Sequence, residues 1–227
     1  MNVDRSTIDY AIQRNKVLTV TSYSYLGNER EYIDTVLERY LSEVGLNVLM
    51  NNISYCIHEV AGNAHKANLK RLYFDLKQLN IENSVDYNSG MTTFKREALQ
   101  HPEKYARHHK QNGYYIKFHF QIEEPYFKVV IRNNVCLTEQ EQQRINKKVE
   151  IARHAHNLAD VYAVSEDYTE GAGLGIVMLH VILRNLGFED TPFRIYTKGE
   201  ETIAFLSLNI GSAAKLEQNY AQLMLGN

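Results

Sequence analysis

Two clusters in this chain combine residue types that could do chemistry. The first lies within residues 58–68 (HEVAGNAHKAN), where Asn63 follows Glu59 by four positions and Lys66 follows Asn63 by three. On a helix this spacing places all three side chains on one face at successive turns. A carboxylate, an amide and an ammonium arranged in this way could polarise water, offer an oxygen ligand to a hard divalent cation and neutralise phosphate. The same spacing also suits an ordinary amphipathic helix with a solvated polar face.

The second cluster is EGAGLGIVML, residues 170–179, in which Gly171, Gly173 and Gly175 precede an apolar helical pattern. Glycines at the start of a helix expose backbone N–H groups at the positive end of the helix dipole, which favours phosphate binding. No predicted strand precedes the cluster, which disfavours the dinucleotide fingerprint of a Rossmann unit. No GKS or GKT sequence is present, so a P-loop is not expected.

The first cluster lies in a long predicted helix, about residues 48–79. The opposite side of that helix is apolar enough to bury against a sheet and carries Ile53, Ile57, Ala61, Ala64 and Leu72. Periodicity predicts further helices at 28–46, 138–156, 174–186 and 212–225, and strands at 16–25, 114–122 and 126–131 with a last hairpin at 192–208. Strands and helices are segregated, so we expect an α+β two-layer sandwich.

The chain reads as a single domain, 1–227, with four attachments. Residues 1–47 form an N-terminal strand and helix extension, 80–113 a net basic insertion with a turn-like start, 157–172 a weakly periodic loop, and 211–227 a C-terminal helical tail. With 44% hydrophobic and 23% charged residues and a net charge of -2, the composition excludes a disordered chain and a polybasic nucleic-acid binder.

No stretch approaches the roughly 18 apolar residues of a membrane span, so we expect a cytoplasmic protein. Cys56 and Cys136 lie in apolar stretches without metal-binding spacing, which predicts small buried side chains in a reduced compartment.

In this order, the two clusters resemble motifs of the GHKL superfamily, which includes histidine kinases, anti-sigma-factor kinases, type II topoisomerases and mismatch-repair ATPases. HEVAGNAHK resembles its N box, and GAGLGI resembles its second glycine box. TKGEETIAFLSL resembles its closing hairpin, in which a Gly-x-x-Thr segment, here ending at Thr202, lies near the nucleotide. The resemblance covers roughly residues 48–208, and the insertion at 80–113 is additional.

The resemblance implies a Bergerat fold, with a mixed sheet covered by helices on one face, that binds ATP with Mg²⁺. Asn63 would coordinate Mg²⁺, Glu59 would position or activate a water or hydroxyl, and Lys66 would contact phosphate. By the same resemblance, 157–172 would form the ATP lid, and the glycines that would wrap the phosphates are Gly171, Gly173 and Gly175.

The sequence departs from the family at the first glycine box, which should follow the VVI strand. Asn133 stands about where an aspartate would recognise the adenine amino group, and Val135 and Leu137 replace glycines. An asparagine accepts a hydrogen bond through its oxygen as aspartate does, but it lacks the charge and can also donate.

The histidines do not complete the known motifs of histidine kinases or zinc enzymes. No proline follows a histidine by five positions, so the chain does not carry the usual phosphoacceptor motif. Gly62 stands where the HExxH zinc motif needs its second histidine after His58, which disfavours zinc chemistry. The pairs His108/His109 and His154/His156 are expected at the surface.

Two functions stay open on the sequence. The first is an ATP- and Mg²⁺-binding signalling protein that acts as a kinase or ATPase on a protein partner in trans. The second is a non-catalytic interaction module that keeps the fold, dimerises through its N-terminal helices, and binds nucleotide weakly or not at all. Neither function involves nucleic acid or a membrane.

Overall fold

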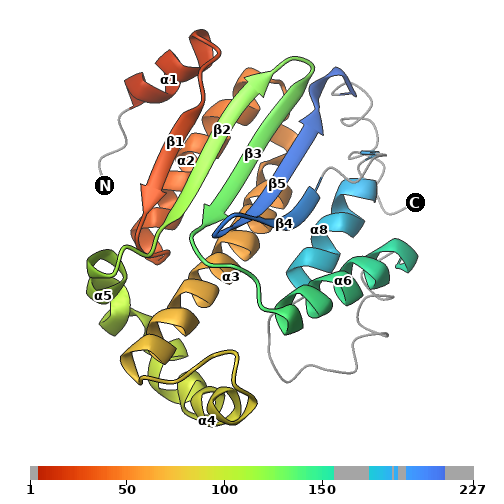
Figure 1. Ribbon diagram of the computed structural model, residues 1–227. Helices are drawn as coiled ribbons and strands as arrows, with labels where there is room; N and C mark the ends of the chain where they lie inside the picture. Colours follow the sequence, from red (N-terminus) through yellow and green to blue (C-terminus); the bar gives the residue numbers. More distant parts are fainter. Residues whose placement is uncertain (1–4, 156–173, 186, 189–192, 213–227) are drawn as a thin grey trace.

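A five-stranded sheet forms one layer of the structure. The computed structural model describes residues 5–155, 174–185, 187–188 and 193–212 (Figure 1). The strands lie in the order β1-β2-β3-β5-β4. Their bounds are Leu18–Ser22 (β1), Ile116–Glu123 (β2), Tyr126–Asn133 (β3), Phe193–Lys198 (β4) and Glu201–Asn209 (β5).

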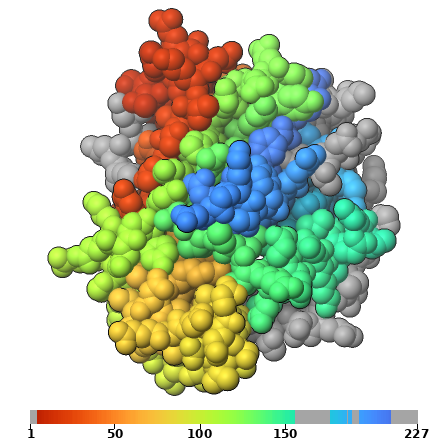
Figure 2. Space-filling model, viewed as in Figure 1, coloured from red at the N-terminus to blue at the C-terminus, as the bar shows by residue number. Residues whose placement is uncertain are grey.

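Helices form the second layer, on the back of the sheet in Figure 1. Helices α2 and α3 cross that face, α8 packs beside α3, and α6 packs on α8, while α1 contacts α2. The front of the sheet faces the viewer without a helix over it in the described part of the chain (Figures 1 and 2). The bounds are Arg5–Gln13 (α1), Gly27–Glu43 (α2), Met50–Leu76 (α3), Glu139–His154 (α6) and Leu174–Asn185 (α8). The α+β two-layer class is therefore confirmed.

The expected mixed sheet is wrong for the described strands, because every neighbouring pair is antiparallel. The crossover from β3 through α6 and α8 does return β4 in the same direction as β3. However, β5 folds back from β4 and takes the position between them. The two parallel strands therefore never share a hydrogen-bonded edge.

The core lies between α2, α3 and the back of the sheet. Alternate residues of β2 and β3 are buried there, as expected for strands with one covered face. The apolar side of α3 meets them, and its five expected members, Ile53, Ile57, Ala61, Ala64 and Leu72, are all buried. The period of the sequence therefore predicted this interface.

Capping residues and glycines in the sequence predicted the ends of several helices. Thr138 caps α6: its Oγ1 accepts a hydrogen bond from the Glu141 backbone N–H (3.2 Å), and Glu141 accepts one from the Thr138 N–H (2.9 Å). This reciprocal pair is the expected capping box. Helices α2 and α8 end at glycines with positive φ, Gly45 (72°) and Gly187 (89°). The expected loop at 157–172 lies outside the described residues. Of the expected tail at 211–227, the structure describes residues 211 and 212, which belong to a short 3₁₀ turn at Ile210–Ser212.

Two helical segments were missed. Helix α1 buries Ile8, Ala11 and Ile12, although it precedes the first strong strand pattern. The turn-like reading of 80–92 is also wrong from Ser84 onward, because Asn83 accepts hydrogen bonds from the N–H groups of Val85 and Asp86 and starts a helix. Turn-forming residues here cap the helix.

The segment that follows is called the helical cap below. It comprises α4 (Ser84–Phe94), a π-helical turn (Lys95–Leu99), a 3₁₀ turn (Pro102–Tyr105) and α5 (Ala106–Gln111). It covers the end of α3 that extends past the sheet (Figure 1). A second small core joins the two and consists of Leu69, Tyr73, Phe74, Phe94 and Ala98. No helix in the described part of the chain is long and apolar enough to cross a bilayer.

His65 of α3 and His109 of α5 meet inside this junction. Their rings lie edge to face, 5.2 Å between centroids, and are 6% and 0% exposed. Burial lowers the pKa of both imidazoles to about 4, with smaller contributions from Lys66 and from the neighbouring histidines. The expectation that His109 lies at the surface is wrong, because α5 packs that side of the helix against α3.

A close contact limits what can replace Gly90 in α4. A Cβ there would lie 2.5 Å from Phe74 Cζ, whereas a Cβ at Gly62 in α3 meets no atom within 4 Å. We expect Gly90→Ala to destabilise the protein by about 1–3 kcal/mol through overpacking. Gly62→Ala should stabilise it by up to about 1 kcal/mol through helix propensity. Urea unfolding of the two variants measures both; a stabilised Gly90→Ala would contradict the packing.

The buried histidines predict a loss of stability in mild acid. Their pKa values are lower in the folded than in the unfolded chain, where the ordinary value is 6.5, so between about 6.5 and 4 the unfolded chain binds more protons. Stability should therefore fall as pH drops through this range. In His109→Leu the fall should be smaller, whereas the exposed His154→Leu should keep the wild-type slope. Equal slopes for all three proteins in unfolding at pH 7, 6 and 5 would contradict this.

Candidate functional site

A cavity of about 220 Å³ lies where α3, the helical cap, the ends of β3 and β5, and α6 meet. Its inner wall is apolar and includes Val60 and Ala64 of α3, Ile131 of β3, and Ala204 of β5. In the space-filling view the α3 and cap region (yellow) and α6 (green to teal) lie side by side below the strands β4 and β5 (blue) (Figure 2). A mostly apolar cavity with a few polar groups is typical of a small-molecule site.

Four residues expected in a nucleotide site line this cavity together: Asn63, Lys66, Asn133 and Thr202. They come from three elements that are far apart in the sequence. Asn63 and Lys66 lie on the half-buried side of α3. Asn133 ends β3 and is paired directly with Thr202 at the start of β5. The antiparallel register therefore joins the end of β3 to the hairpin of β4 and β5.

Asn133 is 3% exposed and belongs to a relay of side-chain amides. Its Nδ2 donates to Asn68 Oδ1 (3.1 Å), and Asn68 Nδ2 donates to the Tyr115 carbonyl (2.9 Å). With its NH₂ group directed to Asn68, Asn133 keeps an oxygen that can accept a hydrogen bond. Thr202 Oγ1 donates to the Val135 carbonyl (2.7 Å) and can still accept through a lone pair.

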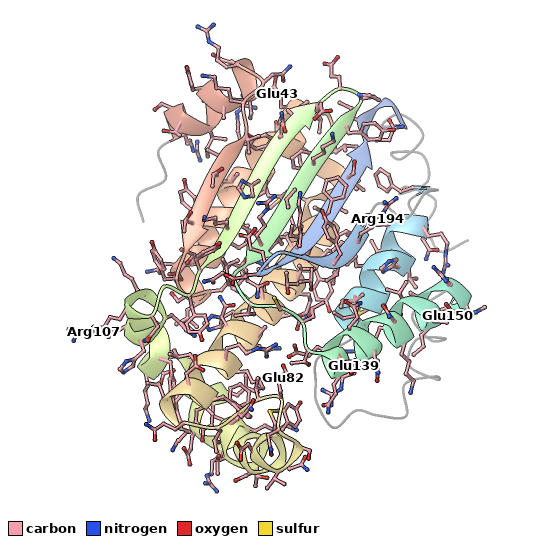
Figure 3. All side chains as sticks on the ribbon, in the orientation of Figure 1. Glu43, Glu82, Arg107, Glu139, Glu150 and Arg194 are labelled. Atoms are coloured by element: carbon pink, nitrogen blue, oxygen red, sulfur yellow. The ribbon has the colours of Figure 1, made fainter. Side chains whose placement is uncertain are left out.

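Basic side chains surround the cavity. Its lining includes Lys66 and Lys70 of α3, Lys95 of the helical cap, and Arg144 and Lys148 of α6. Helix α6 runs beside α8, and Glu139 and Glu150 mark its course in Figure 3. Arg144 and Lys148 lie between these two residues in the sequence, one helical turn apart. Among the described lining residues the one carboxylate is Glu141. Lys70 is paired with this carboxylate (2.8 Å), and the cationic side chains of the lining are groups that could contact an anionic ligand.

Glu141 ties α6 to α3. It accepts hydrogen bonds from Lys70 Nζ (2.8 Å) and Arg71 Nη2 (2.7 Å), and Arg71 also donates to the Cys136 carbonyl (2.7 Å). Burial alone would raise the pKa of Glu141, but the hydrogen bonds and charges of Arg71 and Lys70 outweigh it and lower the pKa to about 2. The loop between β3 and α6 is thereby held against α3.

Among the described residues, Glu59 is the expected site residue that is not brought to this cavity. Glu59 lies on α3 one turn before Asn63, is half-buried, and does not line the cavity. Gly175 is the second residue of α8. Gly171, Gly173 and the expected lid at 157–172 fall outside the described residues.

The sequence reasoning missed several residues that shape the site. Lys70 lies one turn beyond Lys66 on the polar side of α3, and Arg144 and Lys148 are four apart on α6, so helical spacing could have found them. Asn68 is the last residue of the 58–68 cluster, and the sequence analysis gave it no role. Nothing in the local pattern indicated that Lys95 would reach the cavity, because its place depends on how the cap packs.

The described histidine, cysteine and carboxylate side chains do not gather at one site. Across the part of the chain that the structure describes, no group of three or more His, Cys, Asp or Glu residues is placed to hold a metal ion. Cys56 is buried as expected. Cys136 is exposed, which corrects the expectation of a buried thiol: the residue belongs to the cavity lining, and its thiol donates to the Gly199 carbonyl (3.4 Å).

Comparison with known proteins adds one relative. A protein of Treponema pallidum (strain Nichols), described as uncharacterized, is 33% identical over 202 residues. The match covers 89% of this chain and 39% of that protein, so the chain spans well under half of the relative's length. No family model and no solved structure matches. The resemblance to the GHKL superfamily therefore rests on the sequence motifs.

The Glu141 clamp predicts a pH-dependent effect of its removal. Glu141→Gln leaves Lys70 and Arg71 without their carboxylate and should lower stability at pH 7 by about 1–3 kcal/mol. Since the folded pKa is depressed, this contribution is present above about pH 4.5 and is lost as pH falls toward 2. The wild type and variant should therefore converge in acid. Glu139→Gln, in the exposed first turn of α6, is the matched control; an equal loss in both variants would contradict the clamp.

Proposed function

We propose that this chain binds ATP with Mg²⁺ in the cavity between α3, β3 and β5, and that it acts in signal transduction as a kinase or ATPase toward a protein partner. The observation that supports the proposal is the convergence of Asn63, Lys66, Asn133 and Thr202 on one cavity. These residues were chosen from separate motifs, and the fold brings them together.

The inner end of the cavity suits a nucleotide base. Asn133 and Thr202 are neighbours there, and each keeps an acceptor for an exocyclic amine. The apolar side chains of Val60, Ile131 and Ala204 would contact the faces and edges of a ring. An acceptor oxygen at position 133 serves the role that the superfamily gives to aspartate, without its charge.

The outer end suits phosphates. Lys66 would neutralise a phosphate, and the Asn63 amide oxygen is the group that would ligate Mg²⁺, which commonly takes few protein ligands and completes its shell with phosphates and water. Bound Mg²⁺ neutralises charge on the transferring phosphoryl group. Glu59, one turn before Asn63, is the carboxylate proposed to orient a water or hydroxyl. Phosphoryl transfer needs mainly such positioning and charge neutralisation.

A second function is favoured by the changes next to Asn133. The side chains of Val135 and Leu137 line the cavity where the superfamily has glycines. They fill space near the ligand and remove the flexible backbone that glycine provides. A non-catalytic interaction module that binds nucleotide weakly or not at all is therefore the alternative.

Melting of the purified chain with ATP, ADP or GTP, with and without Mg²⁺, separates the two functions. A ligand that binds the folded state at a hundred times its Kd adds about 2.7 kcal/mol, or roughly 5–10 °C for a chain of this size. We expect such a rise with ATP and Mg²⁺, a loss of its Mg²⁺-dependent part in Asn63→Ala, and no change in Asn51→Ala, an exposed position on the same helix. No rise with any nucleotide at millimolar concentration would favour the interaction module.

The role of Glu59 needs its own test. Glu59→Gln should keep ATP binding, because Glu59 does not line the cavity, and should lower phosphate release or transfer by at least about 100-fold, the usual contribution of a general base. Unchanged turnover in this variant would remove Glu59 from the mechanism while leaving ATP binding intact.

A further inference from the structure

Two sets of hydrogen bonds at the inner end of the cavity end on backbone carbonyls. In the first, Asn133 Nδ2 donates to Asn68 Oδ1 (3.1 Å), and Asn68 Nδ2 donates to the Tyr115 carbonyl (2.9 Å). In the second, Thr202 Oγ1 donates to the Val135 carbonyl (2.7 Å). Each set therefore ends on a group that can only accept a hydrogen bond.

The Tyr115 carbonyl decides how both amides are turned. It carries no proton, so the group of Asn68 that faces it must be the NH₂ group. The oxygen of Asn68 then faces Asn133, which must direct its own NH₂ group toward that oxygen. Turning either amide by 180° would bring two acceptors or two donors together, which costs free energy in a buried site.

Tyr115 is itself held in place next to β2. Its backbone N–H donates to Asn134 Oδ1 (2.8 Å), and Asn134 Nδ2 donates to the Gly113 carbonyl (2.9 Å). Its hydroxyl donates to Glu201 of β5 (2.8 Å). Because these bonds hold the residue on both sides, its carbonyl is a fixed reference for Asn68, which is 3% exposed.

A ligand at the inner end of the cavity would therefore meet acceptors. Asn133 and Thr202 line the cavity as a cross-strand pair, whereas Asn68 does not line it. The NH₂ group of Asn133 is directed to Asn68 and the hydroxyl proton of Thr202 to a carbonyl, which leaves the Asn133 oxygen and a Thr202 lone pair for the ligand. These atoms attract an amino group and repel a carbonyl oxygen.

We propose that Asn68 is a positioning residue that makes the site select a base with an exocyclic amino group over a base with a carbonyl group at the same place. It acts without touching the ligand, by holding the oxygen of Asn133 toward the cavity. A site built on hydrogen bonds discriminates strongly, because the wrong ligand leaves buried polar groups unpaired. This inference rests on the proposed nucleotide function and deepens it, since it gives a role to a residue that the motifs left without one.

Calorimetric titration of the full chain with ATP and ITP in the presence of Mg²⁺ tests the selection, because the two nucleotides differ chiefly in the group at C6. The wild type should bind ATP at least about tenfold more tightly, since a carbonyl group facing the Asn133 oxygen leaves both unpaired. Asn68→Leu has a similar shape and no polar atoms, so the Asn133 amide can turn. The ratio of the two affinities should then fall below about threefold.

Two further variants keep the result specific to the orientation of Asn133. Asn68→Asp still offers an acceptor to the Asn133 NH₂ group and should keep the preference for ATP. Asn51→Leu makes the same change at an exposed position of α3 and should also keep it. The readout is a ratio within one protein, so a loss of stability that weakens both nucleotides equally does not change it.

Equal binding of ATP and ITP by the wild type, or the same ratio in the wild type and Asn68→Leu, would overturn the role of Asn68 and leave nucleotide binding standing. Adenosine and inosine separate the base from the phosphates. If adenosine is preferred to inosine in an Asn68-dependent way and ATP with Mg²⁺ binds no better than adenosine, the role of Asn68 stands and the ATP function is wrong. If no nucleoside or nucleotide binds, both are wrong.

Discussion

The packing of α3 against the back of the sheet is the contact on which the rest of the structure depends. Ile53, Ile57, Ala61 and Ala64 are buried in this interface. Each large aliphatic side chain buried in this way contributes roughly 1.5–3 kcal/mol, and the two alanines let the helix approach the strands closely. Once the apolar face of α3 is packed on the sheet, helical geometry fixes the direction of its polar face. The amide of Asn63 and the ammonium groups beyond it are therefore placed by a hydrophobic interface that contains none of them.

The length of α3 explains why the site has a cap. Its 27 residues span about 40 Å, whereas the 8 residues of β2 or β3 span about 26 Å. The end of α3 therefore extends past the sheet, where Leu69, Tyr73 and Phe74 would face solvent without another cover. The helical cap buries them, and in doing so brings a further helical face to the cavity. The overhang of α3 requires a cover, and the cap that covers it also adds the charged side chain of Lys95 to the cavity lining.

The difference between local and long-range interactions explains what the sequence could predict. Periodicity and end signals act within a few residues, so α3, α6, the β2–β3 hairpin and the two-layer class were predicted. The antiparallel sheet was not, because it depends on β5 folding back between β3 and β4. The burial of His109 and the position of Lys95 were missed for the same reason, since both depend on how the cap packs on α3. Four residues that the motifs selected, Asn63, Lys66, Asn133 and Thr202, do line one cavity, although they are distant in the chain.

The asparagine at position 133 is best understood together with Asn68. An aspartate at this nearly buried position would carry its charge toward the cavity, where it would offset part of the surrounding positive charge and meet the Oδ1 atom of Asn68. A neutral asparagine avoids that repulsion, because its NH₂ group donates to Asn68 while its oxygen remains an acceptor. Asparagine at position 133 therefore keeps a hydrogen-bond acceptor beside Thr202 and adds no negative charge to the cavity. The amide pair of Asn133 and Asn68 in this way joins the end of β3 to α3 by hydrogen bonding alone.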